Sequence, residues 1–241
     1  MIQQLEDNDS LEIIAVGPLS NIAMVVKDRP DLLHKVEKVW VMGGNFKTPG
    51  NIGNNPYPAI DHLHNHTAEW NIWTDIEAAR VVLEAGLDLY LVPLDATNSV
   101  PSSEKFVETF KMETRKSPTA VSEFIAWNYD LPFIRNWLSE DRFYFWDTLA
   151  VGIAIDQDFC KEWVQVSVTV DDTKTEHYFV YSDQAQPGFS DQNRYGEARS
   201  HYHPLVAGAI VEDPKVPEIS ICLAAKADDF YQHFLSTTTQ N

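Results

Sequence analysis

The sequence predicts an α/β fold in which a mainly parallel, open sheet is covered by helices on both faces. Three apolar, strand-length runs support this prediction, at 11–16, 39–42 and 89–92, with helical spacing between them. Strands buried on both faces are typical of parallel sheets, whose connections are helices. The 241 residues, 44% of them hydrophobic, suffice for one sizeable core or two small ones. We expect a single domain over residues 1–241.

The first strand is expected to be buried and to end at Gly17-Pro18. A helix should follow, because Leu19, Ile22, Ala23 and Val26 recur at helical spacing. Pro18 suits the first turn of that helix, where its missing amide proton would have no partner.

The second strand stops at Gly43-Gly44. The next helix is marked at both ends, since Thr74 to Glu77 has the pattern of a capping box and Gly86 suits the C-terminal cap. The strand at 89–92 follows directly.

The later half of the chain begins with helices and ends with strands. We expect two or three helices between Pro101 and Asp141, and another from Asp147 to Ile155. Strands are predicted at 164–170, 177–181 and 219–223, a long loop at 182–204, and a closing helix at 228–235.

The charge balance limits the partners. The 36 acidic and 18 basic residues give a net charge of −18, which repels phosphate backbones and anionic lipids. We therefore expect neither nucleic acid nor a membrane as partner, and no apolar run approaches the roughly 20 residues of a membrane span. The polar start shows no signal peptide, and two cysteines predict buried thiols in a reducing compartment. The expected localisation is cytoplasmic.

Polar residues that suit a sugar lie in the loops after the predicted strands, where open α/β sheets bind ligands. Glu69 and Asn71 close the loop that begins at Gly43, and on an extended backbone side chains two residues apart share a face. A carboxylate and an amide side by side suit a polyol such as ribose. Taken alone, Asp147 is more simply a helix N-cap, and Glu69 and Asn71 are solvated loop residues.

Six blocks of sequence, taken together, resemble the inosine–uridine-preferring nucleoside hydrolases in content and order. They are IIAVGPLSNIA, VWVMGGN, GN, AEWNIWTDIEAARVVLEAG, LVPLDATNSV and WDTLAVGIAID. The likeness runs from about Leu11 to Leu235 and is weakest at 101–144 and 182–204. It implies an enzyme that cleaves the N-glycosidic bond of small-molecule nucleosides, with a homo-oligomer as an open expectation.

The resemblance also implies a Ca²⁺ ion that chelates the ribose 2′- and 3′-hydroxyls and the attacking water. Its ligands would include the backbone carbonyl of Val16 and the carboxylate of Asp147. Met42 would lie against the ribose, and the sugar hydroxyls would be held by Asn51, Glu69 and Asn71, with Asn71 nearest the metal. Oxygen donors of this kind are the ligands that calcium prefers.

One departure from the family pattern concerns the leaving base. Many members carry a histidine before the late aspartate, as the acid for the leaving group, whereas this sequence has Trp146. That resembles the purine-specific branch, in which a tryptophan stacks on the base. A π-face favours a cationic purine; the alternative is that Trp146 only fills a core.

A second departure concerns the water-activating aspartate. The family's Asp-x-Asp-x-Gly-x-Asp-Asp segment supplies two calcium ligands and that aspartate, and nothing like it occurs here; Glu6, Asp7 and Asp9 lie in a polar leader. We therefore expect an N-terminally truncated chain that lacks the first strands of the sheet and has little hydrolase activity. The alternative is a catalytically dead relative that binds nucleosides or a partner protein.

A rival from another enzyme class is a zinc site. His62, His64 and His66 alternate, and His201 and His203 could add to them. The asparagine and proline residues at 54–58 indicate a loop rather than a strand, which disfavours this reading. Asn65-His66-Thr67 also forms a glycosylation sequon.

Overall fold

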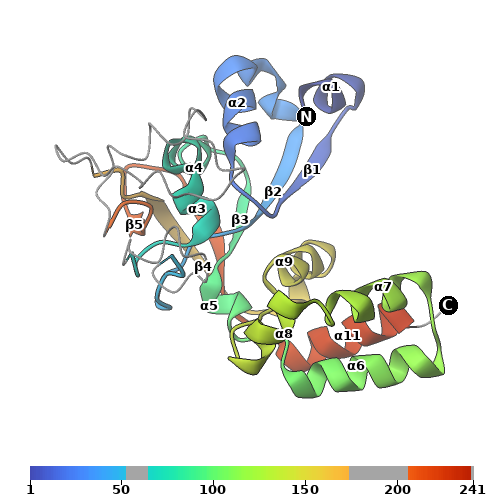
Figure 1. The fold of residues 1–241 in the computed structure, drawn as a ribbon. Helices are drawn as coiled ribbons and strands as arrows, with labels where there is room; N and C mark the ends of the chain where they lie inside the picture. The colour runs from blue at the N-terminus through green and yellow to red at the C-terminus, as the bar shows by residue number, and fades with distance from the viewer. Residues whose placement is uncertain (53–64, 174–205, 240–241) are drawn as a thin grey trace, which may run out of the picture. The chain divides into compact units, whose positions relative to one another are not determined.

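The computed structural model describes residues 1–52, 65–173 and 206–239. The chain divides into two compact units, Met1–Asp95 with Trp163–Cys222, and Ala96–Glu162 with Leu223–Asn241. The first unit contains the sheet, and the second is mainly helical (Figure 1). The single-domain organisation over residues 1–241 stays a prediction.

The sheet has six strands in the order β1-β2-β3-β6-β4-β5. β1 pairs with β2, β2 with β3 and β3 with β6, all in parallel, whereas β4 and β5 are antiparallel. The predicted α/β, mainly parallel class is therefore confirmed. The strands are β1 (Leu11–Ala15), β2 (Val36–Met42), β3 (Leu89–Val92), β4 (Cys160–Val170), β5 (Ile210–Glu212) and β6 (Glu218–Ala225).

The register of the parallel strands brings their carboxyl ends to one edge of the sheet. Ala15 is paired with Val41, and Met42 with Val92. Val16, the loop after Met42 and the start of α5 (Leu94–Thr97) therefore leave the sheet at neighbouring positions. This edge holds most of the polar residues singled out in the sequence.

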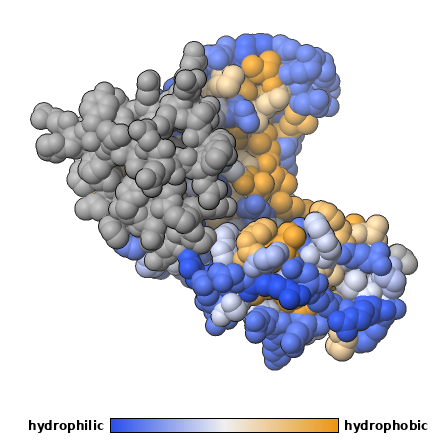
Figure 2. All heavy atoms as spheres, in the orientation of Figure 1, coloured by the Kyte–Doolittle hydropathy of each residue, from blue (hydrophilic) through white to orange (hydrophobic). Residues whose placement is uncertain are grey.

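The prediction that the first strand is buried is wrong. β1 is the end strand of the sheet, and Ile14 and Val16 remain 42% and 41% exposed. Met24 is a further exposed apolar side chain of this unit, on which Figure 2 shows hydrophobic surface. β2 and β3, by contrast, are largely buried, as expected for central parallel strands.

Two helices near the start differ from the sequence prediction. The polar leader forms α1 (Ile2–Asp7), whose Leu5 is fully buried against Val25 and Leu32. α2 (Ser20–Asp28) begins with Leu19 as its N-cap, so Pro18 precedes the helix instead of lying in its first turn. The short 3₁₀ helix η1 (Pro30–Lys35) then leads into β2.

The predicted capping box at Thr74 is also wrong. Thr74 ends α3 (Trp70–Thr74), and Asp75 caps α4 (Ile76–Leu83) by accepting a hydrogen bond from the Ala78 amide at 3.1 Å. Asp75 also accepts from the Ser20 hydroxyl at 2.5 Å, which ties α4 to α2. The predicted role of Gly86 is consistent with its left-handed φ of 71° just after the helix.

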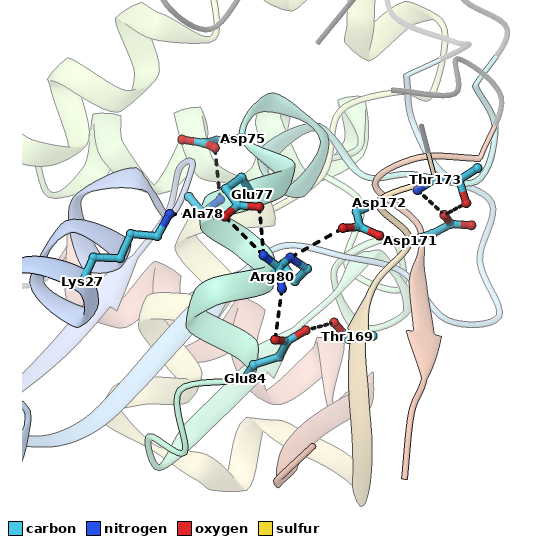
Figure 3. A network of polar contacts seen from close by, with 10 residues as sticks. All are labelled: Lys27, Asp75, Glu77, Ala78, Arg80, Glu84, Thr169, Asp171, Asp172 and Thr173. Atoms are coloured by element: carbon cyan, nitrogen blue, oxygen red, sulfur yellow. Dashed lines mark hydrogen bonds and ion pairs between the residues drawn. The ribbon is translucent and has the colours of Figure 1, made fainter. Parts of the chain in front are cut away.

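A network of charges centred on Arg80 fixes α4 to the end of β4 (Figure 3). The Arg80 guanidinium lies 3.1 Å from Glu77, 3.3 Å from Glu84 and 3.7 Å from Asp172. Glu84 in turn accepts a hydrogen bond from Thr169 at 2.7 Å. α3, which carries Asn71, directly precedes α4 in the chain.

The helices of the second unit agree with the prediction of several helical pieces after Pro101. An aromatic core joins them, with the Phe145 ring 5.2 Å from Phe106 and 5.3 Å from Phe230. Thr119 starts α7 with a capping box that it shares with Ser122. The elements are α6 (Glu104–Lys116), α7 (Ala120–Asn128), α8 (Pro132–Ser139), α9 (Trp146–Ile155), η3 (Gln157–Phe159) and α11 (Ala227–Thr239).

The prediction of two free thiols is wrong, because Cys160 and Cys222 are both disulfide-bonded. A disulfide persists in oxidising surroundings, so the cysteines give the cytoplasmic prediction no support. None of the helices in the described ranges is long and apolar enough to cross a membrane. The predicted strand at 177–181 and loop at 182–204 lie outside the described residues.

Candidate active site

Met42 and Asn71 are in direct contact at the end of β2. The Asn71 side-chain amide donates a hydrogen bond to the Met42 carbonyl at 3.1 Å and lies 3.4 Å from the Met42 sulfur. Met42 is 2% exposed and Asn71 9% exposed. The contact fixes the orientation of the amide, so that Nδ2 faces the strand end and Oδ1 is the group available as an acceptor.

Glu69 joins the loop after β2 to the start of α3. Its Oε2 atom accepts hydrogen bonds from the amides of Gly44, Asn71 and Ile72, at 3.1, 2.9 and 3.2 Å. Glu69 is therefore the N-cap of a helix, and Asn71 lies in its first turn. The expectation that the two side chains share one face of an extended segment is wrong, since the backbone turns into a helix between them.

Asn51 is held against the same helix start. Its side-chain Oδ1 atom accepts a hydrogen bond from the Trp70 backbone amide at 2.8 Å. Its backbone amide donates to the Ala68 carbonyl at 3.1 Å. Gly50 allows this approach, because a Cβ added there would lie 2.2 Å from the Ala68 oxygen. The structure thus brings Met42, Asn51, Glu69 and Asn71 together.

Asn65 anchors the segment that leads to Glu69. Its side chain is fully buried, donates to the Ala207 carbonyl at 3.1 Å, and accepts from the amides of Thr67 and Ala68, each at 3.0 Å. The Nδ2 atom to which a glycan would be joined is therefore engaged in the fold, which disfavours the sequon as a modification site.

Val16 leaves the sheet beside these residues. It follows β1 directly, and the pairing of Ala15 with Val41 places it level with Met42. Its carbonyl is therefore on the edge where the Asn71 amide lies. A role for that carbonyl as a metal ligand stays a prediction.

In the second unit, Trp146 is the first residue of α9 and is half-buried in an aromatic cluster. Its indole N–H donates to the Asn98 side-chain oxygen at 3.3 Å. The rings of Trp137, Phe143 and Tyr144 lie 6.1, 5.8 and 5.7 Å from its centroid. These contacts fix the plane of the indole ring.

Asp147 follows Trp146 in the first turn of α9, but it is not the N-cap, which is Phe145. The simpler reading of Asp147 as a capping residue is therefore wrong. Although the residue as a whole is exposed, desolvation raises the pKa of its carboxyl above the usual range. No hydrogen bond or cation within the described residues offsets this effect.

The two residues expected to bind metal belong to different units, Val16 to the first and Asp147 to the second. Among the described residues, no three His, Cys, Asp or Glu side chains are grouped so as to hold a metal ion. For the rival zinc site, His62, His64, His201 and His203 lie outside the described residues.

Two further residues, Asp95 and Asn98, take part in the geometry although sequence reasoning missed them. Asp95 bonds to the backbone of the loop after β2, and Asn98 holds Trp146. The available signal was their position directly after the strand at 89–92, since loops at the carboxyl ends of parallel strands build ligand sites.

Comparison with known proteins identifies the family. A family model described as inosine-uridine preferring nucleoside hydrolase matches residues 1–232. Nucleoside hydrolase 3 of Arabidopsis thaliana is 29% identical over 164 residues, which are 59% of this chain and 18% of the relative. The pyrimidine-specific ribonucleoside hydrolase RihA of Enterobacter sp. is 29% identical over 126 residues, or 52% of this chain and 36% of the relative.

Solved structures share the fold. The purine-preferring ribonucleoside hydrolase from Gardnerella vaginalis superposes with a TM-score of 0.69 at 18% identity. The match covers 99% of this chain and 63% of that one. The chain thus spans less than two thirds of the length of each of these relatives.

Replacing Gly50 should disturb the loop that carries Asn51. Gly50→Ala places a methyl group against the Ala68 backbone, so we expect the free energy of unfolding to fall by about 1–3 kcal/mol. Gly17→Ala is the matched control, because a Cβ at Gly17 meets no atom within 4 Å, and it should change stability by less than about 0.5 kcal/mol. Urea unfolding measures both; equal effects would contradict the crowding at Gly50.

The raised pKa of Asp147 predicts a pH-dependent cost in stability. The ionised carboxylate is disfavoured in the folded protein, so the cost is absent below the unfolded pKa, near 3.8, and complete above the raised pKa. In metal-free buffer, Asp147→Asn should therefore raise Tm at pH 7, and the gain should shrink as the pH falls toward 4. A gain in Tm that does not change with pH would show that ionisation of Asp147 is not its cause.

Proposed function

The chain belongs to the inosine–uridine preferring nucleoside hydrolase family, and on this premise we propose that it binds ribonucleosides for cleavage of their N-glycosidic bond to ribose and free base. The observation that carries the proposal is the group formed by Met42, Asn51, Glu69 and Asn71. Amides and a carboxylate held rigidly beside an apolar thioether suit a sugar, which presents hydroxyls and an apolar face.

The hydrogen bonds within this group determine which side-chain atom of each asparagine would contact the sugar. Asn71 would bind a sugar hydroxyl through Oδ1, since its Nδ2 atom is bonded to Met42. Asn51 would donate from Nδ2, since its Oδ1 atom is bonded to Trp70. Oε2 of Glu69 accepts hydrogen bonds from three backbone amides, which holds the carboxylate beside the two asparagines. Each polar group has one atom fixed by the fold, which limits the conformational entropy that binding would remove.

We further propose Ca²⁺ as the cofactor, with the Val16 carbonyl and the Asp147 carboxylate among its ligands. The donor chemistry fits, because both groups offer oxygen to a hard cation, and desolvation of Asp147 is a cost that a bound cation would offset. When bound, the ion would supply chelation of the sugar hydroxyls and of a water molecule. The protein's own residues orient the sugar and, through Trp146, receive the base.

The preference for purine bases rests on Trp146. Purine-preferring and pyrimidine-specific relatives both occur, so the comparisons do not decide between the bases. Trp146 offers a large π-face whose plane is fixed by Asn98 and three neighbouring rings. A purine overlaps such a face over two rings and gains a positive charge as it leaves, which the face stabilises.

Inosine binding tests the proposed function. The 241-residue chain should bind inosine in calorimetry, and Ca²⁺ should strengthen that binding, because the ion would hold two of the sugar hydroxyls. Asp147→Ala should abolish the calcium effect, whereas Asp156→Ala, which removes the N-cap of η3, should retain it.

Ribose release from inosine should be slow in all of these proteins, because the sequence carries no Asp-rich motif to activate water. Absence of inosine binding, or binding of stoichiometric Zn²⁺ in place of Ca²⁺, would refute the assignment.

Replacing Trp146 tests the purine preference. Stacking on an aromatic side chain contributes about 1–3 kcal/mol per base, so Trp146→Ala should weaken inosine binding roughly 5- to 150-fold. Uridine, whose base has one ring, should lose less. Trp146→Phe keeps a ring but removes the hydrogen bond to Asn98, and it should give an intermediate result. An equal loss for inosine and uridine would show that Trp146 only holds the pocket together.

A further inference from the structure

Asp95 is a second carboxylate, after Glu69, that binds backbone amides of the loop following β2. Its carboxylate accepts three backbone hydrogen bonds, from Phe46 at 2.7 Å to Oδ2, and from Lys47 at 2.7 Å and Thr48 at 3.0 Å to Oδ1. The neighbouring amide of Leu94 donates to the Gly44 carbonyl at 2.9 Å. The loop is therefore fastened to the end of β3 by four hydrogen bonds.

The loop also closes on itself. The buried Asn45 side chain donates to the Thr48 carbonyl at 2.8 Å, so that residues 45–48 form a compact turn around the Asp95 carboxylate. Only Pro49 and Gly50 separate this turn from Asn51. Proline has a fixed φ, and Gly50 is packed against Ala68, so the short link transmits the position of the turn to Asn51.

We propose that Asp95 is a positioning residue for the sugar site: its carboxylate holds the loop at 44–51 so that Asn51 can reach the ribose. The inference rests on the proposed nucleoside binding and deepens it, because Asp95 would act through Asn51 without touching the ligand. Two carboxylates then hold the two ends of the site. Glu69 fixes the start of α3, and Asp95 fixes the loop that lies against it.

Two substitutions separate the parts of this role. Asp95→Ala removes all three acceptors. Asp95→Asn keeps one oxygen for Lys47 and Thr48 but turns an N–H₂ group toward the Phe46 amide, so the loop should be held only in part. Asp213→Ala is the matched control, because Asp213 also accepts a backbone hydrogen bond, from Lys215 at 3.0 Å, in a turn outside the loop.

The experiment is a double-mutant cycle with inosine as the probe, measured by calorimetry in calcium-containing buffer on the 241-residue chain. We expect Asp95→Ala to weaken binding roughly 10-fold, Asp95→Asn to weaken it less, and Asp213→Ala to leave it unchanged. In an Asn51→Ala background, Asp95→Ala should weaken binding by no more than about 2-fold further, because the residue through which it acts is gone. Hydrogen exchange of the Phe46, Lys47 and Thr48 amides should accelerate in Asp95→Ala.

The possible results are distinguishable. Failure of the unaltered chain to bind inosine refutes the proposed function, and this inference with it. Unaltered binding after Asp95→Ala, or equal losses with and without Asn51, refutes the positioning role while the proposed function stands. If the Asp95→Ala protein does not fold, the same double-mutant cycle is measured with Asp95→Asn. Equal losses of inosine binding with and without Asn51 would then refute the positioning role.

Discussion

The carboxylate of Glu69 is the interaction on which the arrangement of the site depends. It is buried, and one of its oxygens accepts amide hydrogen bonds from both Gly44 and the first turn of α3. Hydrogen bonds to an ionised group contribute about 1.5–3 kcal/mol each, and unpaired buried amides would cost a similar amount. Because Gly44 adopts a left-handed φ of 76°, the chain turns sharply enough at the end of β2 for its amide to meet Glu69. An apolar substitute would leave three amides without a partner at the point where the strand, the loop and the helix meet.

The parallel arrangement of the strands explains why carboxylates accept so many backbone hydrogen bonds at this edge of the sheet. All the parallel strands end at the same edge of the sheet. The loops that leave this edge carry backbone amides for which no neighbouring strand offers a carbonyl acceptor. Glu69 and Asp95 together satisfy four amides of the loop after β2, and Glu69 satisfies two more in the first turn of α3. Neither residue needs to touch a ligand for this purpose. One side-chain atom of each neighbouring asparagine is likewise held by the fold, Oδ1 of Asn51 by the Trp70 amide and Nδ2 of Asn71 by the Met42 carbonyl.

The sequence predicts the strands well because their signal is local. The apolar runs of β2 and β3 and the glycines after them depend on burial and turn geometry within a few residues. Prediction from the sequence fails where a contact between residues far apart in the chain decides the local structure. The seven-residue leader has only Met1, Ile2 and Leu5 as apolar side chains, and α1 is stabilised by packing of Leu5 on Val25 and Leu32. Glu69 and Asn71 were identified as a pair, but their geometry follows from hydrogen bonds to residues far away in the sequence, the Gly44 amide for Glu69 and the Met42 carbonyl for Asn71. For Asp95 and Asn98 the sequence offers only their position after a predicted strand, because their partners, the loop after β2 and Trp146, are set by tertiary contacts.

The carboxylate of Asp147, at the start of α9, is less well satisfied by the fold than the carboxylate of Glu69. A carboxylate in the first turn of a helix is stabilised by the helix dipole, yet Asp147 makes no cap hydrogen bond, and desolvation still raises its pKa. Stability alone would favour an amide or an N-cap residue at this position, because either would avoid an uncompensated charge. Trp146 beside it is likewise fixed by Asn98 and by ring contacts while remaining half-buried. Glu69 and Asp95 accept hydrogen bonds from several backbone amides, whereas no hydrogen bond or cation among the described residues offsets the desolvation of the Asp147 carboxylate. Glu69 and Asp95 therefore contribute to the stability of the fold, whereas the charge of Asp147 lowers it.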